Sequence, residues 1–196
     1  MRWARLTLPA FWLLGCVAFV ASAQQTGSAS ARKNLTHFSR QIVDRHQQLY
    51  DMSCIPMSIE LVLKLLDRVP ASYYDLQNPW KNKSDGNFSN FDGKTIAGVT
   101  FHKQFGLERN QQFPLDKLFE TIDKELKAGR FVIVSLASGG GWHMYVIYDE
   151  DADGDFLAVS KAGANTMEAS HLKRTIKQMQ GTDILTYDPG RPIPNS

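Results

Sequence analysis

A cysteine, a glutamine and a histidine are the residues of this chain whose types and spacing point to chemistry. Gln48 stands six residues before Cys54, in the stretch Gln-Leu-Tyr-Asp-Met-Ser-Cys-Ile-Pro. Ser53 is a typical N-cap residue and Pro56 suits a first helical turn, so we expect Cys54 at the start of a helix. The unpaired N–H groups and the dipole of a helix N-terminus favour negative charge there. The pattern therefore predicts a cysteine that ionises easily and acts as a nucleophilic thiolate.

The histidine expected to serve Cys54 is His143, which follows three glycines and Trp142. Acyl transfer by a thiol needs a base within hydrogen-bond reach, a group that orients this base, and donors for the developing oxyanion. The glycines allow the backbone to approach the site closely at His143. The side-chain amide of Gln48 can donate to an oxyanion beside the Cys54 N–H without bringing a full charge. His46 is a weaker candidate for the base because it only neighbours the cysteine stretch.

The N-terminus predicts export. An apolar run, Leu6–Val20, follows two arginines, and Ala21-Ser22-Ala23 gives a cleavage pattern of the A-x-A kind. We expect residues 1–23 to be a signal peptide, which makes the protein periplasmic or secreted. Two alternatives remain open. The run is a lipoprotein signal modified at Cys16, or it is kept as a membrane anchor, although it is short of the roughly 20 apolar residues of a spanning helix.

Removal of the signal peptide leaves one thiol. The chain has two cysteines, and Cys16 lies within the predicted signal peptide, so Cys54 has no internal disulfide partner. A lone thiol in an oxidising compartment is a liability unless it is used or well buried. Three interpretations follow from this count: a reactive thiol, a small buried hydrophobic residue, or an intermolecular disulfide.

The rest of the chain suits one domain. We interpret 24–33 as a flexible leader rich in small and polar residues, 34–188 as the domain, and 189–196 as a loose tail with prolines. The formal net charge is +2 with no basic block, which argues against nucleic acid as a partner. We expect a peptide or protein substrate, no cofactor, no metal and no stable membrane span.

The order of the predicted elements is helices first and hairpins second, which indicates an α+β fold with two layers. A run that is apolar on nearly all sides predicts a central helix. Within 34–50 the apolar spacing predicts a helix that ends near 47, and further helices are expected at 55–66, 72–76 and 114–128. The expected strands are 131–136, 143–148, 156–160 and 183–187. We expect 78–94 to be a long loop and 95–107 to be a short helix or a strand.

The segment from Gln48 to Cys54-Ile55-Pro56, followed by an apolar helix, resembles the papain-like cysteine peptidases. It is most similar to the branch that removes double-glycine leader peptides from bacteriocins, together with its secreted relatives. A later helix, the strand after Gly129, a glycine-rich turn and the strand from His143 match in order, so the resemblance covers about 45–162. It implies a papain-like fold with N-terminal helices packed on an antiparallel sheet. It also implies Cys54 as nucleophile, His143 as base and Gln48 as oxyanion donor.

The chain departs from this family at three places. Ile55 stands where the family has glycine, and Met57 and Ser58 replace small residues. The strand after the histidine strand lacks the aspartate or asparagine that orients the histidine, and the matching region contains Ser160 and Lys161. Ser160 can orient the ring as a neutral acceptor, and Asn165 is a second candidate if its loop folds back. Lys161, if it pointed at His143, would depress the pKa of the imidazole.

Two functional hypotheses follow from these features. The first is an exported cysteine peptidase or amidase, which can also pass the acyl group to an amine. The second is a non-catalytic papain-like binding module that has lost the third catalytic residue.

A separate motif, Asp149-x-Asp151-x-Asp153-Gly154, matches the first half of a calcium loop. Position twelve is Ser160 instead of glutamate and the flanks are predicted strands, so the motif favours a solvated hairpin turn over weak calcium binding.

Overall fold

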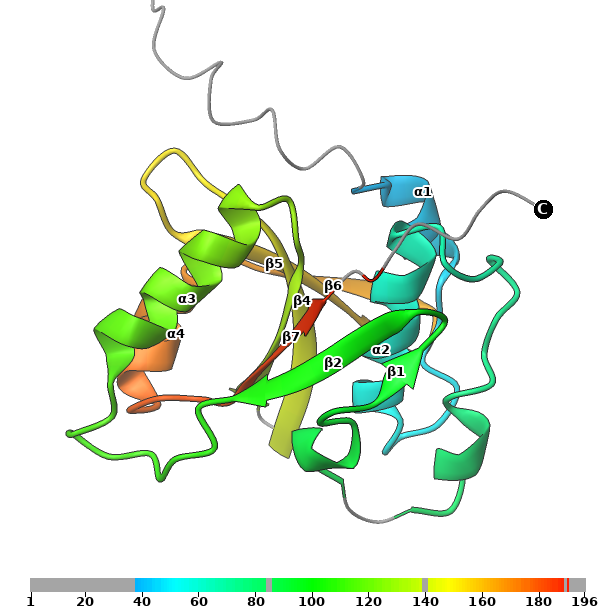
Figure 1. The fold of residues 1–196 in the computed structure, drawn as a ribbon, viewed down its shortest axis with the longest axis horizontal. Helices are drawn as coiled ribbons and strands as arrows, with labels where there is room; N and C mark the ends of the chain where they lie inside the picture. Colours follow the sequence, from blue (N-terminus) through cyan, green and yellow to red (C-terminus); the bar gives the residue numbers. More distant parts are fainter. Residues whose placement is uncertain (1–37, 84–85, 139–140, 189, 191–196) are drawn as a thin grey trace, which may run out of the picture.

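A computed structural model describes residues 38–83, 86–138, 141–188 and 190, and Figure 1 shows their arrangement. The predicted signal peptide, the lipoprotein site at Cys16 and the leader lie outside the described residues, as does the predicted tail apart from Gly190. Among the helices of these ranges, none is long and apolar enough to cross a membrane.

The core of the fold is a seven-stranded sheet in which every pair of neighbouring strands is antiparallel. The order is β1-β2-β7-β3-β4-β5-β6, so the last of the described strands lies inside the sheet, between β2 and β3. With helices at the N-terminal end, this confirms the α+β class. The strands are β1 (Thr95–Ile96), β2 (Val99–Gln104), β3 (Val132–Ser138), β4 (Gly141–Glu150), β5 (Phe156–Ala162), β6 (Asn165–Ala169) and β7 (Ile184–Asp188).

Helices cover both faces of the sheet, so the arrangement has three layers where two were expected. Figure 1 shows α1 and α2 on one side of the sheet and α3 and α4 on the other. Side chains alternate along each strand, and the two faces therefore belong to two separate apolar clusters. The helices are α1 (Arg40–Arg45), α2 (Cys54–Leu65), α3 (Leu115–Lys127) and α4 (Leu172–Gln178).

Helix α2 is the central helix that the apolar run predicts. All twelve of its residues are buried, and it packs against β4 and β5. Ser53 is the N-cap residue, but its side chain makes no capping bond; its hydroxyl lies 2.7 Å from both the Tyr50 carbonyl oxygen and Gln77 Oε1, which share its one hydrogen. The N-terminal end of α2, with Cys54, thereby meets the strand that begins near His143.

The N-terminal helix is shorter than predicted. It ends at Arg45 because the backbone of His46 is extended and the His46 ring bonds to the Met57 carbonyl of α2 at 2.9 Å. Farther along, the Gln48 N–H donates to the Gly163 carbonyl at 2.9 Å. Tertiary hydrogen bonds thus override the helical periodicity of this stretch.

Three other predictions change in the structure. The short helix expected at 72–76 is wrong, because this segment forms turns. The ambiguous stretch 95–107 contains the strands β1 and β2, and the sequence did not predict β6 or α4. The expected 78–94 loop contains two short 3-10 helices, η2 (Asn78–Trp80) and η3 (Phe88–Asn90), and buries the side chains of Trp80, Phe88 and Phe91 in the core.

Truncation of α2 tests how much the fold depends on its burial. We expect Ile59→Ala to lower the free energy of unfolding by about 2–5 kcal/mol, because Ile59 is fully buried and its loss leaves a cavity. Urea denaturation measures this change. Leu107→Ala is the control, since Leu107 is 55% exposed, and it should stay within about 0.5 kcal/mol. Equal effects of the two substitutions would contradict the central position of α2.

Candidate functional site

Cys54 is the first residue of α2, and its thiol is free and buried, with 8% of the residue exposed. Burial raises the pKa of the Cys54 thiol, while the backbone N–H groups of Ile55, Cys54 and Met144 act in the opposite direction. The expectation that the Cys54 thiol ionises easily rests on the effect of the helix N-terminus alone. In the folded protein desolvation outweighs that terminus, so the resting thiol is protonated at neutral pH.

His143 is held by the neighbouring strand. Its Nε2 lies 2.8 Å from the Ser160 hydroxyl oxygen, and that hydroxyl donates to the Met144 carbonyl at 2.5 Å. A serine hydroxyl has one hydrogen, so Ser160 must accept from the histidine ring. This assigns the proton of the neutral ring to Nε2 and leaves the lone pair on Nδ1. Burial lowers the pKa of His143, opposed by the backbone of Lys161, so the neutral ring predominates at pH 7.

The ends of β4 and β5 separate at this point. Their pairing runs from Glu150–Phe156 to Val146–Val159 and does not continue to the described residues beyond that pair. The separated ends leave the backbone of Met144 free of a strand partner on this side. Met144 can therefore accept from Ser160 through its carbonyl while its N–H lies at the Cys54 sulfur.

The structure thus brings Cys54 to the residue that follows His143, but it does not join the two side chains. Among the described residues, no hydrogen bond links the Cys54 sulfur to the His143 ring. His143 shares its face of β4 with Tyr145, whose ring centroid lies 5.5 Å away, whereas Met144 belongs to the cluster beneath α2. A direct contact between the sulfur and the ring therefore requires the His143 side chain to move from its position beside Tyr145.

The amide of Gln48 is already engaged. Its Nε2 donates to the carbonyls of Tyr50 and Asp51, each at 2.9 Å, while its Oε1 is buried and has no hydrogen-bond partner among the residues that the structure describes. Both N–H bonds of the predicted oxyanion donor therefore stabilise the loop before Cys54. An oxyanion can bind this amide only if it replaces one of those carbonyls.

Ser160, Lys161 and Asn165 were the candidates beside His143, and the structure separates them. Ser160 contacts the ring. The Lys161 ammonium points to the other face, where it donates to the Thr166 hydroxyl at 2.8 Å. Asn165 begins β6 opposite Ala162 and is exposed.

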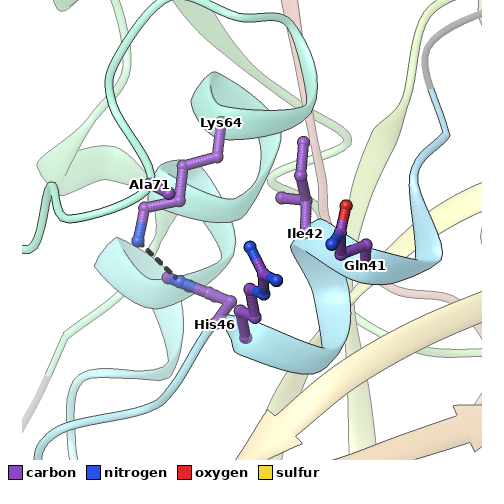
Figure 2. A pocket seen from close by; sticks show the side chains of 6 residues that line it. Gln41, Ile42, His46, Lys64 and Ala71 are labelled. Carbon is purple, nitrogen blue, oxygen red and sulfur yellow. Dashed lines mark hydrogen bonds between the residues drawn. The ribbon is translucent and has the colours of Figure 1, made fainter.

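His46 does not serve Cys54. Its Nε2 bonds to the Met57 carbonyl, and its Nδ1 lies 3.0 Å from the Lys64 ammonium. Figure 2 shows His46 and Lys64 pointing toward each other beside a small cavity, which measures about 50 Å³ and is lined also by Gln41, Ile42 and Ala71. Burial, aided by Lys64, lowers the pKa of His46 to about 3. The ring is therefore neutral at neutral pH and has no free nitrogen.

The calcium-like motif forms a hairpin turn. The Asp151 carboxylate accepts from the N–H groups of Asp153 and Asp155, each at 2.9 Å. Within the part of the chain that the structure describes, no group of three His, Cys, Asp or Glu residues is placed to hold a metal ion. The carboxylates thus close the turn, in agreement with the favoured interpretation.

Sequence reasoning missed two residues next to the site, Glu60 and Gln77. Both are fully buried and bond to each other at 2.7 Å. The sequence does indicate a role for Glu60, because it stands within a helix that is apolar on all sides, where a carboxylate must find a buried partner. Gln77 lies in a segment without periodicity, so its sequence context gives no such signal.

Large apolar side chains are exposed at the borders of the site. Leu49 and Met52 lie on the loop before Cys54, at 39% exposed each, and Trp142 precedes His143 at 46%. The Arg109 guanidinium stacks on the Trp142 ring at 3.8 Å. The surface next to both candidate residues therefore offers apolar contacts.

Comparison with protein-family models, with curated proteins and with solved structures gave no match.

The Ser160 contact predicts how His143 titrates. The Ser160 oxygen accepts the Nε2 proton and stabilises the imidazolium more than the neutral ring. Because Ser160→Ala removes this acceptor, we expect the pKa of His143 to fall further. NMR titration of the ring protons measures this shift. Ser135→Ala on β3 is the control and should leave that pKa unchanged. An unchanged or raised pKa in Ser160→Ala would contradict the assigned contact.

The buried His46 predicts a pH dependence of stability. Its pKa in the folded state, about 3, is below the ordinary value of 6.5, so the unfolded chain binds the additional proton between these values. Stability from this group is fully present above pH 6.5 and is lost as pH falls below it, by up to about 1.4 kcal/mol per pH unit. Glu60, whose pKa burial raises, acts in the opposite direction.

A substitution separates the two contributions. We expect His46→Gln to flatten the decline in unfolding free energy between pH 6.5 and pH 5, measured by urea denaturation at each pH. His102→Gln is the control, because His102 is partly exposed and pairs with Asp188 at the sheet end. The same slope in His46→Gln and in the unsubstituted protein would show that the folded ring is not held neutral.

Proposed function

We propose that this protein is an exported cysteine peptidase or amidase with a papain-like fold, in which Cys54 is the nucleophile and His143 is the base. The observation that carries the proposal is the hydrogen bond from His143 to Ser160 on the next strand. It gives the ring an orienting partner and leaves Nδ1 as the basic nitrogen. The backbone immediately after this histidine lies at the Cys54 sulfur.

The reaction begins from an uncharged pair, because burial raises the pKa of Cys54 and lowers that of His143. As the ring turns toward the thiol, Nδ1 takes its proton while the sulfur attacks the carbonyl carbon of the substrate. The tetrahedral intermediate collapses to a thioester, and the imidazolium gives its proton to the leaving amine. Water then attacks the thioester, with His143 again as base, and releases the acid. An amine in place of this water gives acyl transfer.

This reaction requires a hydrogen bond between the Cys54 thiol and the His143 ring, which the described residues do not form at rest. Catalytic hydrogen bonds in structures without substrate are often long and tighten only in the complex. Ser160, a neutral acceptor, supports the imidazolium less than a carboxylate does. A thiol needs less activation than a hydroxyl, so a weaker orienting group suffices for measurable rates.

The oxyanion is expected to bind at the start of α2. Cys54 and Ile55 hold the first two helical positions, whose N–H groups have no partner within the helix. The amide of Gln48 is the additional donor if the oxyanion replaces the carbonyl of Tyr50 or Asp51. The exposed Leu49, Met52 and Trp142 favour a peptide with apolar side chains near the scissile bond.

A non-catalytic papain-like binding module is the second candidate. Two observations favour it: burial raises the pKa of the Cys54 thiol, and both N–H bonds of Gln48 are occupied. In such a module Cys54 would be a small buried residue.

Alkylation of Cys54 by iodoacetamide decides between the two candidates. If His143 is the base, alkylation of Cys54 depends on the neutral ring, and His143→Ala lowers the rate at pH 7 by about 100-fold. His102→Ala is the matched control and should react like the unsubstituted protein. Mass spectrometry with time points at several pH values measures the rates. An alkylation rate that does not depend on His143 at any of these pH values would refute the enzyme.

A further inference from the structure

We propose that Gln77 is a positioning residue, which clamps the loop 47–53 to helix α2 and so sets Gln48 relative to Cys54. The proposal rests on the proposed function, because it assigns to Gln77 the arrangement of that site. It concerns a residue far from Cys54 in sequence, in a segment of turns between α2 and the first strand.

All four hydrogen-bonding positions of the Gln77 side chain are used. Its Oε1 accepts from the Leu49 N–H at 2.7 Å, and it competes with the Tyr50 carbonyl for the one hydrogen of the Ser53 hydroxyl, also at 2.7 Å. Its Nε2 donates to the Gln47 carbonyl at 3.0 Å and to the Glu60 carboxylate at 2.7 Å. One buried carboxamide therefore contacts the loop at both ends. We call this set of bonds the loop clamp.

Glu60 connects the loop clamp to the helix that carries the thiol. Its carboxylate also accepts from the backbone N–H groups of Leu76 and Gln77, at 2.8 and 3.2 Å. Glu60 lies in the same helix as Cys54 and is fully buried. Glu60 of α2 thus fixes the position of Gln77, and Gln77 in turn fixes the position of the loop.

The residue held most directly is Gln48. Gln47 and Leu49, its two neighbours, both bond to Gln77, and its own N–H donates to the Gly163 carbonyl at 2.9 Å. Its amide therefore has a restricted set of positions beside the Tyr50 and Asp51 carbonyls. Catalytic groups gain from this kind of support, because a displacement of about 1 Å costs orders of magnitude in rate.

A carboxamide is the side chain that this position requires. The loop presents a backbone donor, a hydroxyl donor and a backbone acceptor, and α2 presents a carboxylate. Glutamate in place of Gln77 would put a second carboxylate against Glu60, and methionine would leave all four partners unsatisfied.

The test compares the purified exported chain with Gln77→Met, which keeps the approximate shape without the hydrogen bonds. Hydrogen exchange of the Leu49 amide, followed by NMR, reports the loop clamp directly, and we expect it to accelerate by about tenfold or more. Iodoacetamide alkylation of Cys54 across pH reports the site. We expect the part of the rate that depends on His143 to fall by about tenfold.

The matched control is Thr182→Val. Thr182 is fully buried, and its hydroxyl donates to the Ser135 carbonyl away from the loop. Urea denaturation gives the stability of each variant. If Thr182→Val and Gln77→Met change stability alike and also change exchange and alkylation alike, Gln77 is merely structural and the proposal is overturned.

Ser53→Ala and Ser53→Thr provide a second pair of variants should Gln77→Met fail to fold. Ser53→Ala removes the hydroxyl that bonds to Gln77, and Ser53→Thr restores a hydroxyl. Faster exchange at Leu49 and slower alkylation in Ser53→Ala, both recovered in Ser53→Thr, support the loop clamp. No change in either measurement overturns it.

Failure of the proposed function has a different signature. In that case alkylation of Cys54 in the unsubstituted protein does not depend on His143. That result refutes both the catalytic site and the positioning role of Gln77 in it. Exchange at Leu49 still shows whether Gln77 holds the loop. A His143-dependent rate that Gln77→Met leaves intact overturns the positioning role alone.

Discussion

The complete burial of helix α2 is the constraint on which the rest of the structure depends. An apolar helix can be enclosed at little cost, but this one carries Glu60 and Lys64, and both are enclosed with it. A buried charge without partners is expensive, so the chain must supply them. The turns after α2 supply Gln77 and backbone N–H groups to Glu60, and the stretch before α2 supplies His46 to Lys64. The loop that precedes Cys54 takes its shape from these partners.

The same burial sets the chemistry of the candidate site. A helix N-terminus alone favours a thiolate, but the apolar cover over Cys54 favours the neutral thiol, and desolvation is the larger effect. His143 experiences a similar environment, and burial likewise favours its neutral ring. The structure therefore holds an uncharged thiol and an uncharged imidazole, in contrast to a preformed thiolate–imidazolium pair.

Several features followed from local patterns, because they depend on interactions between near neighbours in the chain. The apolar run gave the central helix that starts at Cys54, and the β-branched stretch after Gly129 gave β3. Other features depended on remote partners. The helix expected up to residue 47 ends at Arg45 because His46 bonds to Met57 of α2. Gln77 could not be recognised because its partners lie 17 to 30 residues away.

The sequence by itself determined the α+β class, the position of Cys54 at a helix start and the set of residues from which a thiol site could be built. These follow from periodicity, capping and cysteine count, which need no knowledge of the partners. Only the tertiary structure decided how those residues meet. It placed Ser160 on the histidine ring and turned Lys161 to the opposite face, because neighbouring residues of a strand point to opposite sides of the sheet. It also tied the amide of Gln48 to its own loop, where the carbonyls of Tyr50 and Asp51 accept both of its N–H bonds.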